Sequence, residues 1–136
     1  DNVGEYRIYY DVKDASGNKA ATAKRYVNVV NEADFMIGTY LAEPSCLGTS
    51  TPSSYNTSVS TSPQVNNEVY IRTVLWTVED DPIMATVDGS AITIPLQTVG
   101  ENTVEGSGTI SGSTFILSVV IDGTSTYDCT IDHTKI

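Results

Sequence analysis

Residues 104–132, with the sequence VEGSGTISGSTFILSVVIDGTSTYDCTID, contain strand-like segments separated by short turn signals. Apolar residues alternate there with small polar ones, which is the period-two pattern of a β-strand. Ser111-Gly112-Ser113 and Gly123-Thr124 fit tight hairpin turns, because glycine tolerates the positive φ that such turns require. Strands joined by tight turns are antiparallel, so this stretch predicts a meander. The expected strands are residues 104–110, 114–122 and 125–132.

The same pattern recurs upstream, and helical periodicity is hard to find. Further strands are expected at residues 36–42, 55–60, 69–76, 83–88 and 91–97, with a tight turn at 88–90. Two irregular stretches interrupt the series: a Ser/Thr/Pro-rich loop over 44–54, which holds Cys46, and a second one over 63–67. Seven or eight antiparallel strands at this spacing predict an all-β fold. It is either a meander closed into a small barrel or a sandwich.

The first 34 residues are expected to form a separate unit. Residues 5–13 alternate in polarity, residues 15–18 are a turn signal, and residues 21–30 supply a returning strand, so we expect a β-hairpin. This unit carries five basic and six acidic side chains, whereas residues 35–136 carry two basic and eleven acidic ones. The charge step places a domain boundary at residue 34, between the hairpin (1–34) and a barrel domain (35–136).

The two cysteines, Cys46 and Cys129, are 83 positions apart. A closed meander brings its first and last strands together, so the barrel predicts that they are close, although an aligned sandwich would also allow it. We expect a disulfide, with two free buried thiols as the alternative. A disulfide favours an oxidising, extracytoplasmic compartment. The chain begins at Asp1 without a signal-peptide pattern, and we interpret it as a mature or trimmed fragment.

The composition argues against several classes of function. A net charge of -10 at pH 7 disfavours a nucleic-acid partner, and no apolar run is long enough for a transmembrane helix. The single histidine, His133, is expected to be an ordinary exposed residue near the chain end. No G-x-S-x-G nucleophile pattern is present, and no pair of carboxylates stands out. The sequence therefore predicts no enzyme activity, no catalytic residue and no cofactor.

One acidic run, Glu79-Asp80-Asp81, offers oxygen atoms of the kind that bind Ca²⁺. Consecutive acids rarely converge on one ion without carbonyl partners, and no EF-hand spacing surrounds them. We therefore expect a solvated turn and predict no metal site.

Three residues of the strand 69–76 are the candidate ligand-binding residues: Tyr70, Arg72 and Trp76. They share one face of the strand, and Tyr and Trp rings are platforms against which sugar rings stack. The simpler interpretation, which we prefer for Trp76, is that it fills the core of a small barrel. Strand 114–122 is apolar in both phases, so we expect it to be buried on both faces.

The segments GEYRIYYDVKDASGN (residues 4–18) and RYVNVV (25–30) fit the pattern G-x-Y-x-x-x-Y-x-x-x-D-x-x-G-N followed by R-x-V-x-V. This pattern resembles the closing hairpin of bacterial immunoglobulin-like surface modules. A whole module of that family is much longer than 31 residues. The resemblance therefore implies either that most of the module is missing or that the hairpin docks onto the following domain.

The later segments GTY (38–40), VDGSAITIPLQ (87–97) and EGSGTI (105–110), with Cys129, resemble uncharacterised small β-barrel domains of predicted surface lipoproteins in gut Bacteroidetes. Such domains often follow an immunoglobulin-like module. GTY is also similar to the G-x-W that opens calycin barrels, with Tyr in place of Trp. The resemblance implies a bacterial cell-surface protein, held to the outer membrane by a lipid on a missing N-terminus, or a periplasmic one.

We therefore predict a non-catalytic binding or spacer module at the bacterial surface, with a surface glycan or a neighbouring surface protein as partner. The preference for glycans comes from the resemblance, with weak support from the Tyr and Trp content. The alternative is a calycin-like barrel that carries a small apolar ligand. A barrel interior filled by side chains would argue against the carrier, whereas a large apolar cavity would support it.

Overall fold

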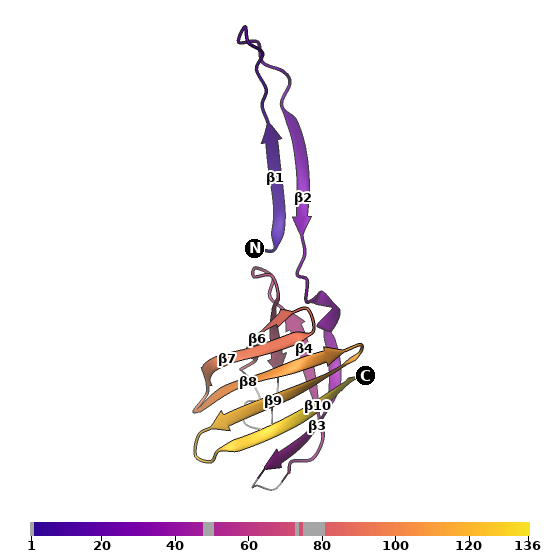
Figure 1. Ribbon diagram of the computed structural model, residues 1–136, viewed down its shortest axis with the longest axis vertical. Helices are drawn as coiled ribbons and strands as arrows, with labels where there is room; N and C mark the ends of the chain where they lie inside the picture. The colour runs from indigo at the N-terminus through magenta and orange to yellow at the C-terminus, as the bar shows by residue number, and fades with distance from the viewer. Residues whose placement is uncertain (1, 48–50, 73, 75–80) are drawn as a thin grey trace.

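The computed structural model describes residues 2–47, 51–72, 74 and 81–136. It consists of a two-stranded sheet, a short 3-10 turn (η1) and an eight-stranded barrel (Figure 1). The elements are β1 (Gly4–Tyr10), β2 (Ala23–Val29), η1 (Asp34–Met36), β3 (Gly38–Leu47), β4 (Tyr55–Thr61), β5 (Glu68–Arg72), β6 (Ile83–Asp88), β7 (Ala91–Val99), β8 (Asn102–Ser111), β9 (Thr114–Asp122) and β10 (Tyr127–Lys135). In the described part of the chain, no helix has the length and apolar character needed to cross a membrane.

The eight later strands form a closed meander, which decides between the two predicted architectures. Each strand from β3 to β10 pairs antiparallel with the next, and β10 pairs in turn with β3. Eight residues of β10 face β3 in continuous register, from Asp128 opposite Leu47 to Lys135 opposite Tyr40. The prediction of an all-β antiparallel meander closed into a small barrel is confirmed.

The barrel core is built by alternate residues of each strand, because successive side chains point to opposite faces of a sheet. In β9, Phe115, Leu117, Val119 and Ile121 are buried. The residues between them point outward, and Ile116 remains 44% exposed. The expectation that this strand is buried on both faces was wrong, because the barrel wall is a single layer and its outer side at Ile116 is open to solvent in the described structure.

Glycine occupies two inward positions of β8, Gly106 and Gly108. They lie opposite Val119 and Leu117 of β9. A Cβ atom on either glycine would collide with a backbone carbonyl of β9, that of Ser118 for Gly106. The missing side chains let the two strands approach closely while β9 supplies the bulk of the core.

Three of the hairpin turns share one geometry. Gly89, Gly100 and Gly112 each occupy the first central turn position with φ near +60°, followed by a residue with negative φ. This is the arrangement of the type II′ turn, which matches the twist of the flanking strands. The predicted turns at 88–90 and 111–113 are confirmed, whereas the turn at Gly100 was not singled out in the sequence.

The loop predicted over 44–54 begins later than expected. Strand β3 continues to Leu47, so Pro44 and Cys46 lie within a strand. The pairing of β3 with β4 ends at Ala42 opposite Tyr55, and beyond that point β3 is paired only with β10. Proline lacks an N–H donor and is tolerated where a strand is paired on one side only. The irregular stretch at 63–67 is confirmed.

A proline also shapes β7, where the register shifts between Ile94 and Gln97. The pairing of β6 with β7 stops at Thr86 opposite Thr93, short of Pro95. The Gln97 side chain replaces the missing pairing. Its Oε1 accepts a hydrogen bond from the Met84 N–H at 2.9 Å, and its Nε2 donates to the Met84 carbonyl at 2.7 Å.

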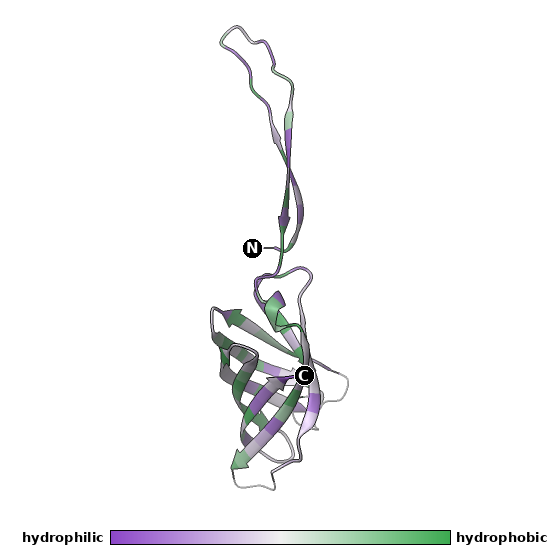
Figure 2. Ribbon diagram, turned by 90° about the vertical axis from the view of Figure 1, so that its right-hand side faces the viewer, coloured by the Kyte–Doolittle hydropathy of each residue, from purple (hydrophilic) through white to green (hydrophobic). Residues whose placement is uncertain are grey.

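The hairpin β1–β2 projects from one end of the barrel (Figures 1 and 2). Its two faces differ. On one face lie the apolar pair Tyr6 and Val27 and, further along, Ile8. On the other face Arg7 lies 5.6 Å from the ring centre of Tyr26 in a cation–π contact. The apolar face is open to solvent, although a two-stranded sheet on its own is only marginally stable in water.

A buried asparagine, Asn31, ties the hairpin to the barrel. Its Nδ2 donates to the carbonyls of Ser62, Val65 and Glu68 at 3.1, 3.0 and 3.2 Å. Its Oδ1 accepts from the N–H groups of Ala33 and Asn67 at 2.9 and 3.0 Å. A backbone bond from Val3 N to Gln64 O, 2.9 Å long, adds a second attachment to the same β4–β5 connection.

Candidate functional site

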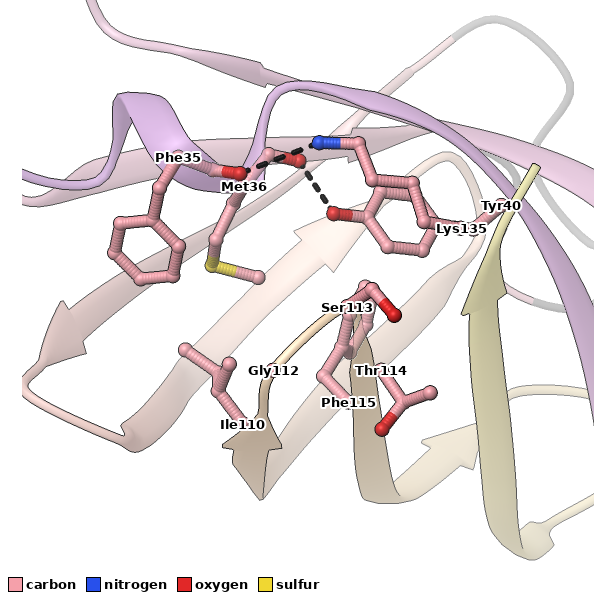
Figure 3. Close-up of a pocket in the computed structure, with 9 residues that line it drawn as sticks. All are labelled: Phe35, Met36, Tyr40, Ile110, Gly112, Ser113, Thr114, Phe115 and Lys135. Atoms are coloured by element: carbon pink, nitrogen blue, oxygen red, sulfur yellow. Dashed lines mark hydrogen bonds between the residues drawn. The ribbon is translucent and has the colours of Figure 1, made fainter.

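An open pocket of about 260 Å³ lies at one end of the barrel (Figure 3). In Figure 3, Phe35 and Met36 of η1 lie at the upper left, Tyr40 of β3 and Lys135 of β10 at the right, and the residues around the β8–β9 turn below them. The lining residues are Phe35, Met36, Tyr40, Ile110, Gly112, Ser113, Thr114, Phe115 and Lys135.

The inner side of the pocket is aromatic and fixed by hydrogen bonds. Tyr40 is buried on β3, and its hydroxyl donates to the Met36 carbonyl at 2.7 Å. Burial raises the pKa of Tyr40 above its usual value of 10, so the hydroxyl remains a neutral donor. The ring of Phe115 meets that of Tyr40 edge to face, with ring centres 4.9 Å apart. The rim is more open, because the Phe35 side chain is 54% exposed.

Lys135 of β10 brings a positive charge to this rim. Its Nζ donates to the Phe35 carbonyl at 3.3 Å and lies 5.8 Å from the centre of the Tyr40 ring (Figure 3). Its aliphatic stem passes over Gly38, where a Cβ atom would lie only 2.5 Å from the lysine Cε. Glycine at position 38 therefore leaves the space that the stem occupies.

His133 lies inside the barrel beneath this aromatic group, and the expectation that it is exposed was wrong. Only 1% of the residue is accessible. Its imidazole stacks on the Phe115 ring with centres 4.1 Å apart, and Nδ1 lies 3.1 Å from the carbonyl oxygen of Ile131. Nε2 has no hydrogen-bond partner among the described residues. The burial follows from β10, which continues to Lys135 and points His133 to the same side as Cys129.

Burial also determines the protonation state of His133. It lowers the pKa from 6.5 to about 4, and hydrogen bonding to the backbone at Ile131 and Phe115 offsets only part of this effect. The imidazole is therefore neutral at pH 7. A charged imidazole needs a hydrogen-bond acceptor at each ring nitrogen, and none of the described residues supplies one for Nε2.

Of the ligand-binding residues predicted from the sequence, Tyr70 and Arg72 do not line this pocket. Tyr70 and Arg72 share the outward face of β5, and Trp76 lies outside the described residues. Tyr70 is half-buried between Ser60 of β4 and Met84 of β6. Its hydroxyl donates to Oε1 of Glu68 at 2.6 Å, which raises its pKa.

Arg72 is exposed at the end of β5, and its backbone carbonyl accepts a hydrogen bond from the Thr57 hydroxyl. The structure thus brings Tyr70 and Arg72 to one patch of the outer barrel wall, on the side formed by β4, β5 and β6. Neither Tyr70 nor Arg72 is among the residues that line the pocket.

The predicted disulfide between Cys46 and Cys129 is confirmed. The two residues lie directly opposite each other in the β3–β10 pairing that closes the barrel. The bond is compatible with an extracytoplasmic protein, since structural disulfides persist in oxidising compartments.

The structure shows no cluster of metal ligands in its described part. Among the residues with described positions, no three His, Cys, Asp or Glu side chains converge on one point. Asp81 is exposed, and Glu79 and Asp80 lie outside the described residues.

The comparisons with known proteins found no family model, no curated protein and no solved structure that matches this chain. The function is therefore argued from the geometry of the pocket and from the chemistry of its lining. Sequence reasoning missed this pocket because its residues come from five separate elements (η1, β3, β8, β9 and β10) between positions 35 and 135. One sequence feature could have indicated it. Tyr40 and Ala42 alternate on β3, and this alternation identifies the inward face of the strand next to the pocket rim.

Proposed function

We propose that this chain is a non-catalytic glycan-binding module of a bacterial cell-surface protein, and that the pocket at the barrel end is its ligand site. One observation carries the proposal. The described interior of the barrel is occupied by buried side chains, whereas this pocket is open and presents an exposed aromatic ring, Phe35.

The lining suits a sugar ring. The C–H bonds on one face of a pyranose carry partial positive charge and pack well on the negative face of an aromatic ring such as Phe35. Ser113 and Thr114 add hydroxyl groups from the β8–β9 turn. The volume of about 260 Å³ is below the roughly 300–1,000 Å³ of pockets for drug-sized ligands. We therefore expect one sugar unit to enter, with any further units outside.

The rest of the chain has a structural role in this proposal. The hairpin belongs to a neighbouring immunoglobulin-like module, and its exposed apolar face around Tyr6 and Ile8 packs on the rest of that module. The protein is held at the outer membrane by a lipid attached to a preceding segment. The disulfide between Cys46 and Cys129 supports the extracytoplasmic location, while the resemblance of the two segments supports the surface assignment.

Amide NMR titration with a panel of mono- and oligosaccharides tests the proposal. We expect sugars to shift the signals of pocket residues, and Phe35→Ala to weaken binding about tenfold, which corresponds to about 1.4 kcal/mol. Tyr26→Ala is the matched control, because it removes an aromatic ring that is 69% exposed on the hairpin, away from the pocket. If no sugar shifts the pocket signals, the glycan proposal fails and a spacer role replaces it.

A small apolar ligand is the second candidate. Met36, Ile110 and Phe115 give the pocket an apolar inner side, which a short acyl or aromatic group would cover. The packed interior restricts such a ligand to the pocket itself. Binding of a fluorescent apolar probe that Phe35→Ala weakens, together with no response to sugars, would favour this candidate over the glycan.

A further inference from the structure

We infer that Lys135 makes this pocket selective for acidic sugars, in which the ring carries a carboxylate, such as a uronic acid. The inference rests on the proposed function, because it names the class of sugar that the same pocket takes. It begins from the charge distribution. Residues 35–136 contain eleven acidic side chains but only two basic ones, Arg72 and Lys135, and one of these two lines the pocket.

Among the described residues, no acidic side chain pairs with the ammonium group of Lys135. Its only polar contacts in the described structure are the Phe35 carbonyl at 3.3 Å and the face of the Tyr40 ring. An ammonium group has three N–H donors, so donors remain for a ligand after the bond to the carbonyl is made. In an acidic protein, where carboxylates are plentiful, an unneutralised ammonium beside an aromatic pocket is suited to a carboxylate supplied by a ligand.

The position of this charge is also prepared before a ligand arrives. The stem of Lys135 lies in the space left by Gly38, and the cation–π contact holds the head near Tyr40. A long flexible lysine normally loses much rotamer freedom when it binds. Because this side chain is already confined, less of that entropy remains to be lost, and a ring stacked on Phe35 would place its carboxylate near the same rim.

A purely structural role for Lys135 makes a different prediction. If the residue only holds η1 in place through the Phe35 carbonyl, its loss should weaken the binding of neutral and acidic sugars equally, since both kinds of sugar contact the Phe35 ring. Charge recognition should affect only the acidic sugar and should survive replacement by another cation.

The experiment is an amide NMR titration of the full chain with galacturonic acid and with galactose, which differ at the carboxylate. We expect galacturonic acid to bind about tenfold more tightly than galactose. Lys135→Met should remove this preference by weakening the binding of galacturonic acid much more than that of galactose, whereas Lys135→Arg should retain most of the preference. Lys24→Met is the control, because it removes one positive charge from the exposed hairpin strand β2.

The outcomes separate the two proposals. If both sugars bind in the pocket with equal affinity, or if Lys24→Met removes the preference as fully as Lys135→Met, the inference is overturned while the glycan site stands. If neither sugar shifts the pocket signals, the proposed function itself fails. If Lys135→Met does not fold, the wild type still tests the inference. Raising salt from about 50 to about 500 mM should weaken the binding of galacturonic acid but not that of galactose.

Discussion

The imidazole of His133 lies flat on the ring of Phe115, with the two ring centres 4.1 Å apart and the planes inclined by 9°. The pair stacks inside the barrel, and Phe115 in turn contacts Tyr40 at the pocket. An ionisable group is therefore part of the apolar core, directly beneath the candidate site. Its Nε2 has no hydrogen-bond partner among the described residues, so protonation would place an uncompensated charge there.

This arrangement predicts a loss of stability in mild acid. The folded-state pKa of His133 is about 4, whereas the unfolded chain has the ordinary value of 6.5. Between these values the unfolded chain takes up the proton first, so the free energy of unfolding falls as pH falls from 6.5 to 4. Above pH 6.5 both states are neutral and the full stability is present. The difference corresponds to about 3 kcal/mol at most.

The variant His133→Phe should remove this dependence while keeping a stacked ring. Urea unfolding of wild type and variant between pH 4 and pH 7 measures the pH dependence of the free energy of unfolding. Subtracting one profile from the other removes the contribution of the carboxylates, which both proteins share. Asp132→Asn, a change at the neighbouring exposed position, is the control and should leave the histidine contribution intact. Parallel pH profiles for wild type and His133→Phe would contradict the burial of a neutral imidazole.

The buried Asn31 makes a second prediction, which concerns the junction between hairpin and barrel. Asn31→Ala removes an amide that five backbone groups contact, including the carbonyls of Ser62 and Glu68. Leaving buried polar groups unpaired costs about 1–3 kcal/mol each when no water replaces the partner. We expect the free energy of unfolding to fall by about 3 kcal/mol.

Chemical denaturation measures this loss, and Asn28→Ala on the exposed side of β2 is the matched control, with an expected change below about 0.5 kcal/mol. Equal stability of the two variants would show that Asn31 does not hold the junction. Hydrogen exchange adds a local measurement, because release of the junction should speed exchange of the Asn67 N–H, which donates to Asn31.

The strand pattern of the barrel could be predicted from the sequence because its cause is local. Alternation of apolar and polar residues together with glycine turns placed β6 and β9 at their observed bounds, 83–88 and 114–122. The meander predicted either a closed barrel or a sandwich, and a disulfide or two free thiols, and the structure decided for the closed barrel and the disulfide. The errors arose where a strand lacks a neighbouring strand along one edge, as at Pro44, or a covering layer on one face, as at Ile116. Pro44 was assigned to a loop, although a strand paired on one side accepts it, and Ile116 was assigned to the core, although it faces outward.

The candidate site was much harder to predict, since it depends on tertiary closure. Phe35 and Lys135 are 100 positions apart and meet only because β10 pairs with β3. His133 was expected to be exposed because it lies near the end of the chain, but the in-phase pattern Cys129, Ile131, His133 indicates an inward face. Extending this alternation from Ile131 to His133 would have predicted that the histidine is buried.

A third prediction concerns Gln97, whose side chain bonds the Met84 backbone where the register of β7 shifts. Gln97→Glu keeps the size of the side chain but replaces the Nε2 donor to the Met84 carbonyl with a second oxygen. At pH 7 the charged oxygen faces that carbonyl and the Pro95 carbonyl, so we expect a loss of about 1–3 kcal/mol. Protonation restores a donor, so the difference from wild type should shrink as pH falls toward 4. Gln64→Glu, at an exposed position, is the control.

Repulsion of the charged form would raise the folded-state pKa of the new carboxyl group above its unfolded value. The stability of Gln97→Glu relative to wild type is then greatest below the unfolded pKa and falls as pH rises through the folded one. Thermal unfolding at several pH values measures this trend. A pH-independent difference would show that the Gln97 amide does not complete the pairing of β6 and β7.

A fourth prediction concerns the disulfide between Cys46 and Cys129. It joins β3 to β10 across the pairing that closes the barrel, and it encloses a loop with a sequence separation of 83. A cross-link over a loop of this length restricts the unfolded chain and stabilises the folded state by about 4 kcal/mol on the chain-entropy model. Replacing both cysteines by alanine should therefore lower the free energy of unfolding by about that amount.

The expected loss is partial, because eight residues of β10 remain paired with β3. The double variant should keep the far-ultraviolet circular dichroism of the wild type and unfold at lower denaturant. Addition of dithiothreitol should move the wild type to the same midpoint and leave the variant unchanged. A wild type that reductant does not shift, with its thiols shown to be free, would contradict a stabilising role. A variant that loses its strand signal altogether would show that β10 cannot close the barrel without the covalent bond.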